Sequence, residues 1–123
     1  MAGMETALSL AARDYRWLLD RGYAESSSLK LVGDRHRLER DERMILFRGV
    51  ASDGASRRRT AMISGDAAGR PLLVDGYNQT FAVMHYLMGK RLFICSDGLL
   101  RDAGSSHGRI ARPELFERAA RLL

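Results

Sequence analysis

Two short apolar stretches of the sequence each lead into an aspartate followed by glycine. Residues 72–74 run into Asp75-Gly76, and residues 92–95 run through Ser96 into Asp97-Gly98. A buried strand that ends on an aspartate presents a carboxylate at the carboxyl edge of its sheet, where ligands of open parallel sheets bind. The repeated pattern therefore predicts that Asp75 and Asp97 lie at one sheet edge, within reach of one cation.

Carboxylate and amide oxygens are the hard ligands that Mg²⁺ and Mn²⁺ prefer. Asp75 and Asp97 are the predicted metal ligands, and Asp102 and Asn78 lie close enough in sequence to support them. A metal ion held in this way activates a bound water for attack on a phosphodiester. Asp-Gly is also a common turn signal, so an alternative in which each aspartate only forms a turn stays open.

Polar and basic side chains around these acids predict contacts to phosphate. Arg101 presents paired donors that match a phosphate group, and His107 in the same loop is suited to donate a proton. The predicted catalytic residues are therefore Asp75, Asp97, Asp102 and His107. The predicted phosphate-binding residues are Arg101, Asn78, Lys30 and Arg35. The competing interpretation is that these side chains only form an ordinary solvated surface, which also contains isolated histidines and charged helix faces.

The apolar spacing divides the chain into two parts. Residues 1–63 predict a helical segment, in which the basic side chains form one face, namely Lys30, Arg35, Arg43, Arg48 and the run 57–59. Residues 64–70 have a linker composition, and residues 71–123 predict strand, helix, strand and helix. A strand, helix, strand order implies a right-handed parallel crossover. The predicted fold class is α/β, with helices followed by a partial parallel sheet. His85 falls on the apolar face of the predicted helix 78–88 and is interpreted as structural.

Composition indicates one small globular protein with a polyanionic partner. The 123 residues carry a net charge of +5, with 18 Arg and 2 Lys. Arginine has a planar set of donors that fits phosphate, although a GC-rich genome also explains its excess over lysine. With one cysteine, no secretory signal and no apolar run long enough to cross a bilayer, the cytoplasm is the expected location.

Several strings of residues resemble an uncharacterised prokaryotic family, domain of unknown function 434. They are residues 13–23, 28–35, Arg43 and 48–49 in the first part, and 74–78, 95–102 and 106–108 in the second. The Val-Asp-Gly-Tyr-Asn string at 74–78 is also similar to the opening strand of NYN-type domains among the PIN-like nucleases. That resemblance implies a doubly wound, Rossmann-like α/β fold with a magnesium site, in which Asp75 is the first acid and Asp97 a second.

PIN-like domains continue through further strands that carry more acids, whereas this chain ends at Leu123. We therefore expect the chain to be short at its C-terminus. The resulting hypothesis is a Mg²⁺- or Mn²⁺-dependent ribonuclease of PIN-like type. The alternatives are a non-catalytic RNA- or nucleotide-binding module, and a subunit that completes its sheet by self-association or with a partner chain.

Overall fold

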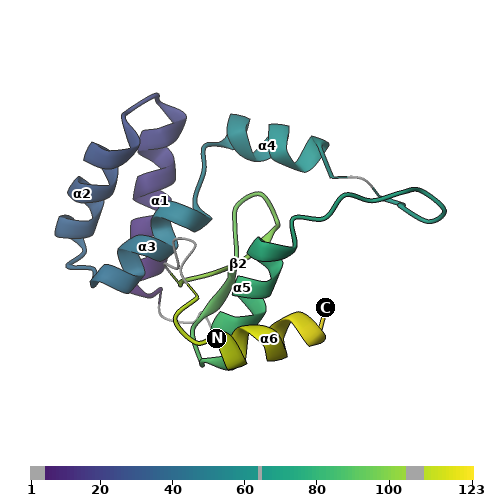
Figure 1. Cartoon of the computed structure of the whole chain (residues 1–123). Coiled ribbons are helices and arrows are strands. Elements are labelled where there is room, and N and C mark those ends of the chain that lie inside the picture. Colours follow the sequence, from purple (N-terminus) through teal and green to yellow (C-terminus); the bar gives the residue numbers. More distant parts are fainter. Residues whose placement is uncertain (1–4, 64, 105–109) are drawn as a thin grey trace.

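The structure is a computed structural model that describes residues 5–63, 65–104 and 110–123. In these ranges the chain forms six helices and one two-stranded sheet (Figure 1). The helices are α1 (Ala7–Asp20), α2 (Glu25–Arg35), α3 (Arg40–Gly49), α4 (Asp53–Ala61), α5 (Gly76–Leu87) and α6 (Pro113–Arg121), and the strands are β1 (Leu92–Ile94) and β2 (Leu100–Asp102). None of the described helices is both long and apolar enough to cross a bilayer.

The predicted helices of the N-terminal half are present, and local hydrogen bonds set their ends. Thr6 precedes α1, and its hydroxyl accepts a hydrogen bond from the Ser9 amide at 3.2 Å. The chain leaves α1 through Gly22 at a φ of +81°, a conformation that glycine adopts without steric cost. At α3, Glu39 and Glu42 form a reciprocal capping box. These caps satisfy backbone groups that a helix leaves unpaired at its ends.

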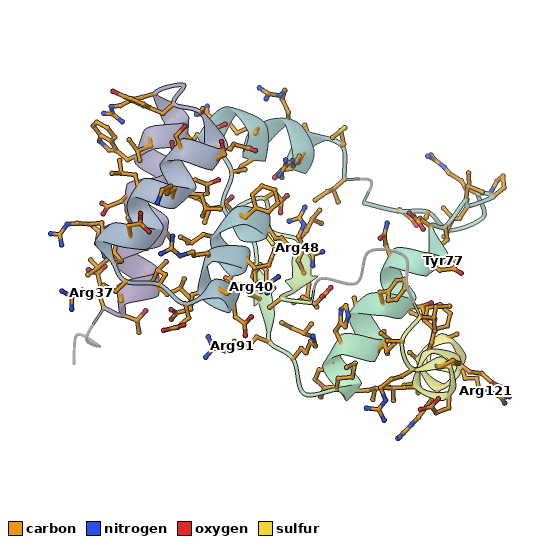
Figure 2. The ribbon with its side chains drawn as sticks, turned by 60° about the vertical axis from the view of Figure 1, so that its left-hand side comes forward. Arg37, Arg40, Arg48, Tyr77, Arg91 and Arg121 are labelled. Carbon is orange, nitrogen blue, oxygen red and sulfur yellow. The ribbon has the colours of Figure 1, made fainter. Side chains whose placement is uncertain are left out.

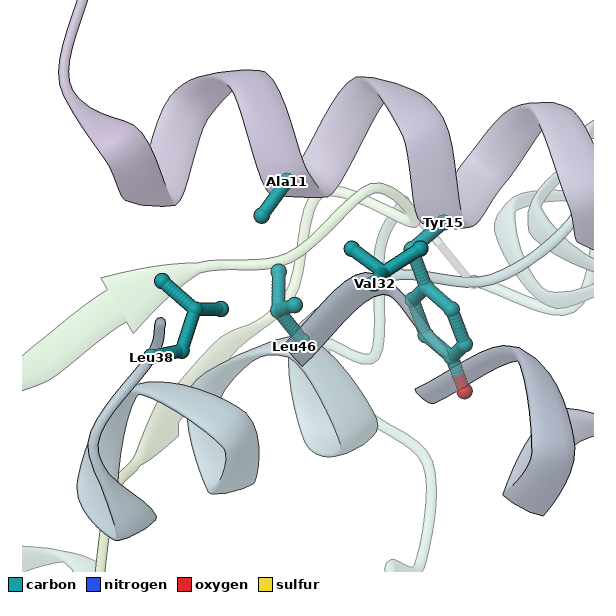
Figure 3. Close-up of a cluster of buried hydrophobic side chains, with 5 residues drawn as sticks. All are labelled: Ala11, Tyr15, Val32, Leu38 and Leu46. Carbon is teal, nitrogen blue, oxygen red and sulfur yellow. The ribbon is translucent and has the colours of Figure 1, made fainter. Parts of the chain in front are cut away.

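The first core lies between α1, α2 and α3 (Figure 3). Tyr15 and Leu46 are its largest fully buried side chains, and they are surrounded by Ala11, Val32 and Leu38. Burial raises the pKa of Tyr15 to about 12, with a smaller contribution from Glu25. Burial of these side chains removes apolar surface from water, which is the main force that holds the three helices together.

A second core joins α5 to α6. Phe81, Met84 and Ala119 are buried there, and Phe116 packs edge-on against Phe81 with ring centroids 5.3 Å apart. Tyr77 lies 5.6 Å from the Phe116 ring, so its ring forms part of the edge of this core. The helical spacing of these residues in the sequence correctly predicted both helices.

The sheet differs from the one that the sequence predicted. β1 and β2 are antiparallel, with Phe93 opposite Arg101, and they are connected by a tight turn. Ser96 and Asp97 form this turn, which the Gly98 amide closes by donating to the Cys95 carbonyl at 2.9 Å, and Gly98 has a φ of +81°. The prediction of an α/β fold with a parallel sheet was therefore wrong, because Asp-Gly between two apolar segments closed a hairpin instead of ending a strand.

The other predicted strand is also absent. Residues 71–74 form neither helix nor strand, and Leu72, Leu73 and Val74 are all exposed. Asp75 therefore follows an unpaired segment and stands at the N-cap of α5. A continuous apolar run signals a strand only when the fold provides a neighbouring strand to pair with it, and none of the described segments does so here.

The hairpin turn provides a test of this architecture. We expect Gly98→Ala to reduce the free energy of unfolding by about 1 kcal/mol, since a Cβ is disfavoured at this positive φ. Urea unfolding followed by circular dichroism measures the change. Gly76→Ala is the matched control, because Gly76 has no positive φ and open space at its Cβ position. Equal destabilisation of the two variants would contradict the hairpin geometry.

Candidate functional site

The hairpin holds two buried aspartates, and the first, Asp97, lies in its turn. Both carboxylate oxygens of Asp97 accept hydrogen bonds from the Arg101 guanidinium, at 2.9 and 2.8 Å. The Leu99 amide donates to the same carboxylate at 3.1 Å, and Arg59 of α4 approaches it at 3.4 Å. Asp97 is only 3% exposed, so this arrangement is a closed ion pair on the inner side of the turn.

These contacts fix the charge of the pair. The hydrogen bonds from Arg101 lower the pKa of Asp97 from its ordinary 3.8 to about 2, against the opposing effect of burial. Asp97 in turn raises the pKa of Arg101 above its ordinary value. A paired carboxylate and guanidinium both remain ionised at neutral pH. A metal ion at Asp97 would have to displace Arg101. Asp97, the predicted metal ligand, and Arg101, the predicted phosphate contact, therefore neutralise each other's charge.

The second aspartate, Asp102, is buried at the end of β2. His85 of α5 lies with its Nδ1 2.6 Å from the Asp102 carboxylate, and the Gly104 amide donates to the same oxygen at 2.7 Å. Arg48 of α3 donates to the carbonyl oxygens of Asp102 and Gly104, at 2.8 and 2.7 Å. Asp102 therefore connects β2 to α5 directly and to α3 through Arg48.

This Asp102 cluster (Asp102, His85, Arg48 and Gly104) has little free space. A Cβ at Gly104 would lie 2.3 Å from Nδ1 of His85 and 2.7 Å from the Asp102 carboxylate, so a side chain there would collide with both. His85 is 2% exposed and its ring stacks on Phe81 with centroids 6.1 Å apart. The cluster is suited to hold three elements together, because each of its polar groups has a partner.

The remaining predicted residues do not gather around Asp97 and Asp102. Asp75 and Asn78 are exposed and hydrogen-bond to each other at 2.7 Å, at the start of α5. Lys30 pairs with Asp34 within α2, and Arg35 is exposed on the same helix. His107 lies outside the described residues. The structure thus brings together Asp97 with Arg101, and Asp75 with Asn78, as two separate pairs.

No group of three or more His, Cys, Asp or Glu side chains that could hold a metal ion occurs among residues 5–63, 65–104 and 110–123. The premise of two aspartates at neighbouring strand ends was wrong, because Asp75 does not follow a strand and Asp97 lies in a hairpin turn. The magnesium or manganese requirement itself stays a prediction.

Sequence reasoning missed the partners that come from elsewhere in the chain. Arg48 and Arg59 were grouped with a basic helical face, and His85 was interpreted only as structural. One signal was present: a histidine on the apolar face of a helix needs a polar partner when it is buried. Nothing in the sequence indicates that this partner is Asp102.

The ion pair at Asp97 predicts a pH dependence. Since its pKa is lower in the folded state than the ordinary 3.8, ionised Asp97 stabilises the fold above about pH 4, and this contribution is lost as the pH falls toward 2. We expect the stability difference between the wild type and Asp97→Asn to shrink by about 2 kcal/mol between pH 5 and pH 2. Urea unfolding at each pH measures it, and parallel pH profiles would contradict the assignment.

The Asp102 cluster predicts a larger effect. Asp102→Asn keeps the size of the side chain but leaves His85 and Arg48 without the buried carboxylate, and should reduce the free energy of unfolding by about 3 kcal/mol. The control is Asp75→Asn, which is exposed and should change stability by less than about 0.5 kcal/mol. Thermal and urea unfolding measure both variants. If Asp102→Asn were as stable as the control, the cluster would not hold the elements together.

Two family models match the chain, one in each half. Residues 7–61 match the family model "Protein of unknown function (DUF434)", and residues 64–123 match the model "Domain of unknown function (DUF5616)". The resemblance to the 434 family is thereby confirmed for the first half. The second half matches a separate model, and the expected NYN-type resemblance there finds no support.

A curated relative is the "Uncharacterized protein MJ0935" of Methanocaldococcus jannaschii. It is 24% identical over 119 residues, which is 95% of this chain and 57% of the relative. The chain therefore spans little more than half the length of that relative. No solved structure matches the chain.

Proposed function

We propose that the protein is a non-catalytic module that binds RNA through its phosphate backbone. The observation that supports this proposal most directly is how its charges are distributed. The buried carboxylates of Asp97 and Asp102 have basic partners inside the fold, whereas Arg57 and Arg58 on α4 face solvent without an acidic partner in the described chain. Such a surface attracts a polyanion, and this binding does not require a metal ion.

The orientation of α4 explains which arginines are available. Ser56, Arg59 and Thr60 face the hairpin turn, where Ser56 meets Ser96 at 3.2 Å and Thr60 donates to the Asp97 carbonyl at 3.3 Å. In a helix, residues three and four apart share a face. Arg57 and Arg58 therefore turn away from the hairpin, and both are exposed.

The other basic residues are less suited to bind a polyanion at one place. Arg43 and Lys30 both pair with Asp34, whose pKa they lower through their hydrogen bonds. Arg48 points from α3 into the interior of the fold, where it serves the Asp102 cluster (Figure 2). Arg37 follows α2, Arg91 precedes β1 and Arg121 ends α6, so these exposed arginines are separated along the chain. Arg57 and Arg58 on α4 are consecutive and exposed, and neither makes an ion pair within the part of the chain that the structure describes.

The predicted ribonuclease activity lacks comparable support. A metal-dependent nuclease needs several carboxylates around one cation, and the two buried aspartates here have internal partners. The RNA-binding alternative needs only exposed arginines and a net positive charge, and both are present. Binding through backbone phosphates is independent of sequence and weakens with added salt.

Fluorescence anisotropy with a labelled single-stranded RNA tests the proposal. The double variant Arg57→Ala/Arg58→Ala should bind about tenfold more weakly, and the slope of log K against log salt should fall by about 1 to 2, one phosphate contact for each arginine removed. The matched control is Arg118→Ala/Arg121→Ala, which removes two exposed arginines from α6. Equal loss in both variants, or no binding by the wild type, would contradict the proposal.

The same RNA incubated with Mn²⁺ distinguishes the two functions. A binding module leaves the RNA intact. Cleavage that disappears in Asp75→Asn or Asp97→Asn would instead favour the predicted nuclease and would reject a purely binding role.

A further inference from the structure

Residues 71–74 present an unpartnered strand-like segment. Leu72, Leu73 and Val74 are consecutive and exposed, and the Leu73 side chain is fully open to solvent. In the described chain no backbone hydrogen bond connects residues 71–73 to another segment. The composition is that of a buried strand, yet the residues lie in the part of the chain that extends from the body between α4 and α5 (Figure 1). Exposed apolar surface of this kind marks an interaction site.

The hairpin offers a free edge for such a strand. The backbone amide of Cys95 donates to the Leu99 carbonyl at 2.9 Å, and the backbone amide of Ala103 donates to the Arg91 carbonyl at 3.0 Å. Alternate residues of an antiparallel strand bond to the same neighbour, so the backbone groups of Leu92 and Ile94 point to the opposite edge of β1. The described sheet contains only β1 and β2, which leaves that edge open.

Apolar grooves lie on both sides of β1. One, of about 310 Å³, is formed by α1, α3 and β1, and Leu8, Ile45, Phe93 and Ile94 are among the residues that line it. The other, of about 230 Å³, lies between α5 and the hairpin, and its lining includes Val83, Tyr86, Leu92 and Leu100. Ile94 is 70% exposed and Leu100 is 59% exposed, so the apolar surface of the hairpin is incompletely covered.

We propose that residues 71–74 of one copy of the chain add as a third strand to the free edge of β1 in a second copy, and that the exchange is reciprocal. Side chains alternate along a strand, so Leu72 and Val74 enter the groove on one face and Leu73 enters the groove on the other. Each copy carries both the donor segment and the acceptor edge, which is the requirement for a symmetric two-fold dimer. The backbone bonds provide affinity and the leucines provide specificity.

Complementarity within the sequence favours a second copy as the occupant. The donor segment has the composition of a buried strand, and the acceptor edge has apolar grooves on both faces, so every copy of the chain carries two parts that fit each other. A two-stranded ribbon is marginally stable alone, and a third strand enlarges the sheet.

Sedimentation velocity of the full chain over a wide range of concentration tests the proposal. The wild type should form a species of twice the chain mass of 13.8 kDa. Leu73→Asp should weaken dimer formation by at least about tenfold, because an unpaired carboxylate would enter an apolar groove. Leu73 is fully exposed in the single chain, so this variant should fold normally by circular dichroism. Ile94→Lys, on the acceptor edge, should have the same effect.

Leu31→Asp is the matched control, since Leu31 is also a well-exposed leucine but lies on α2. It should dimerise like the wild type. Hydrogen exchange at the Leu92 and Ile94 amides adds a second measurement, with protection that rises with protein concentration and is lost in Leu73→Asp. The proposal would be overturned if the wild-type chain remained monomeric, or if Leu73→Asp formed a dimer as readily as the wild type. It would also be overturned if the amide protection were independent of protein concentration. The last result would indicate that the segment folds onto its own hairpin.

Discussion

The buried carboxylate of Asp102 is the interaction on which the arrangement of the two halves depends. A carboxylate with 5% exposure is costly to bury unless donors surround it, and here they come from His85 and the Gly104 amide, with Arg48 nearby. Because these donors belong to α5, to the segment after β2 and to α3, the hairpin can satisfy Asp102 only when it lies between the two groups of helices.

The position of the hairpin also brings it into contact with the end of α3. The Ser96 amide donates to the Gly49 carbonyl at 2.8 Å, and the Ser96 hydroxyl accepts from the Ala51 amide at the same distance. A Cβ at Gly49 would lie 2.9 Å from the Phe93 ring, so a glycine at the end of α3 lets the strand approach closely. Polar bonds and close packing therefore act together at one contact.

Both halves bury a small apolar core and leave other apolar side chains exposed. Tyr15 and Leu46 are fully buried in the first half, where Trp17, Leu31 and Phe47 are exposed, and the second half leaves Leu72, Leu73, Ile94 and Leu100 exposed around a small hairpin. In the second half Asp97 and Asp102 are internal, whereas Asp75 and several arginines are exposed. An RNA backbone and a second copy of the chain would use different parts of this surface, α4 for the first and the edge of β1 for the second.

Local patterns in the sequence determined the helices, and they left the Asp97-Gly98 turn open as an alternative to a strand end. The helices depend on neighbours within about four residues, so spacing and capping residues reveal them. The pairing of β1 with β2, the exposure of residues 72–74, and the partners of Asp97 and Asp102 depend on tertiary structure. Arg48 lies 54 residues from Asp102 and Arg59 lies 38 from Asp97, and no local pattern encodes which distant side chain a buried carboxylate will meet.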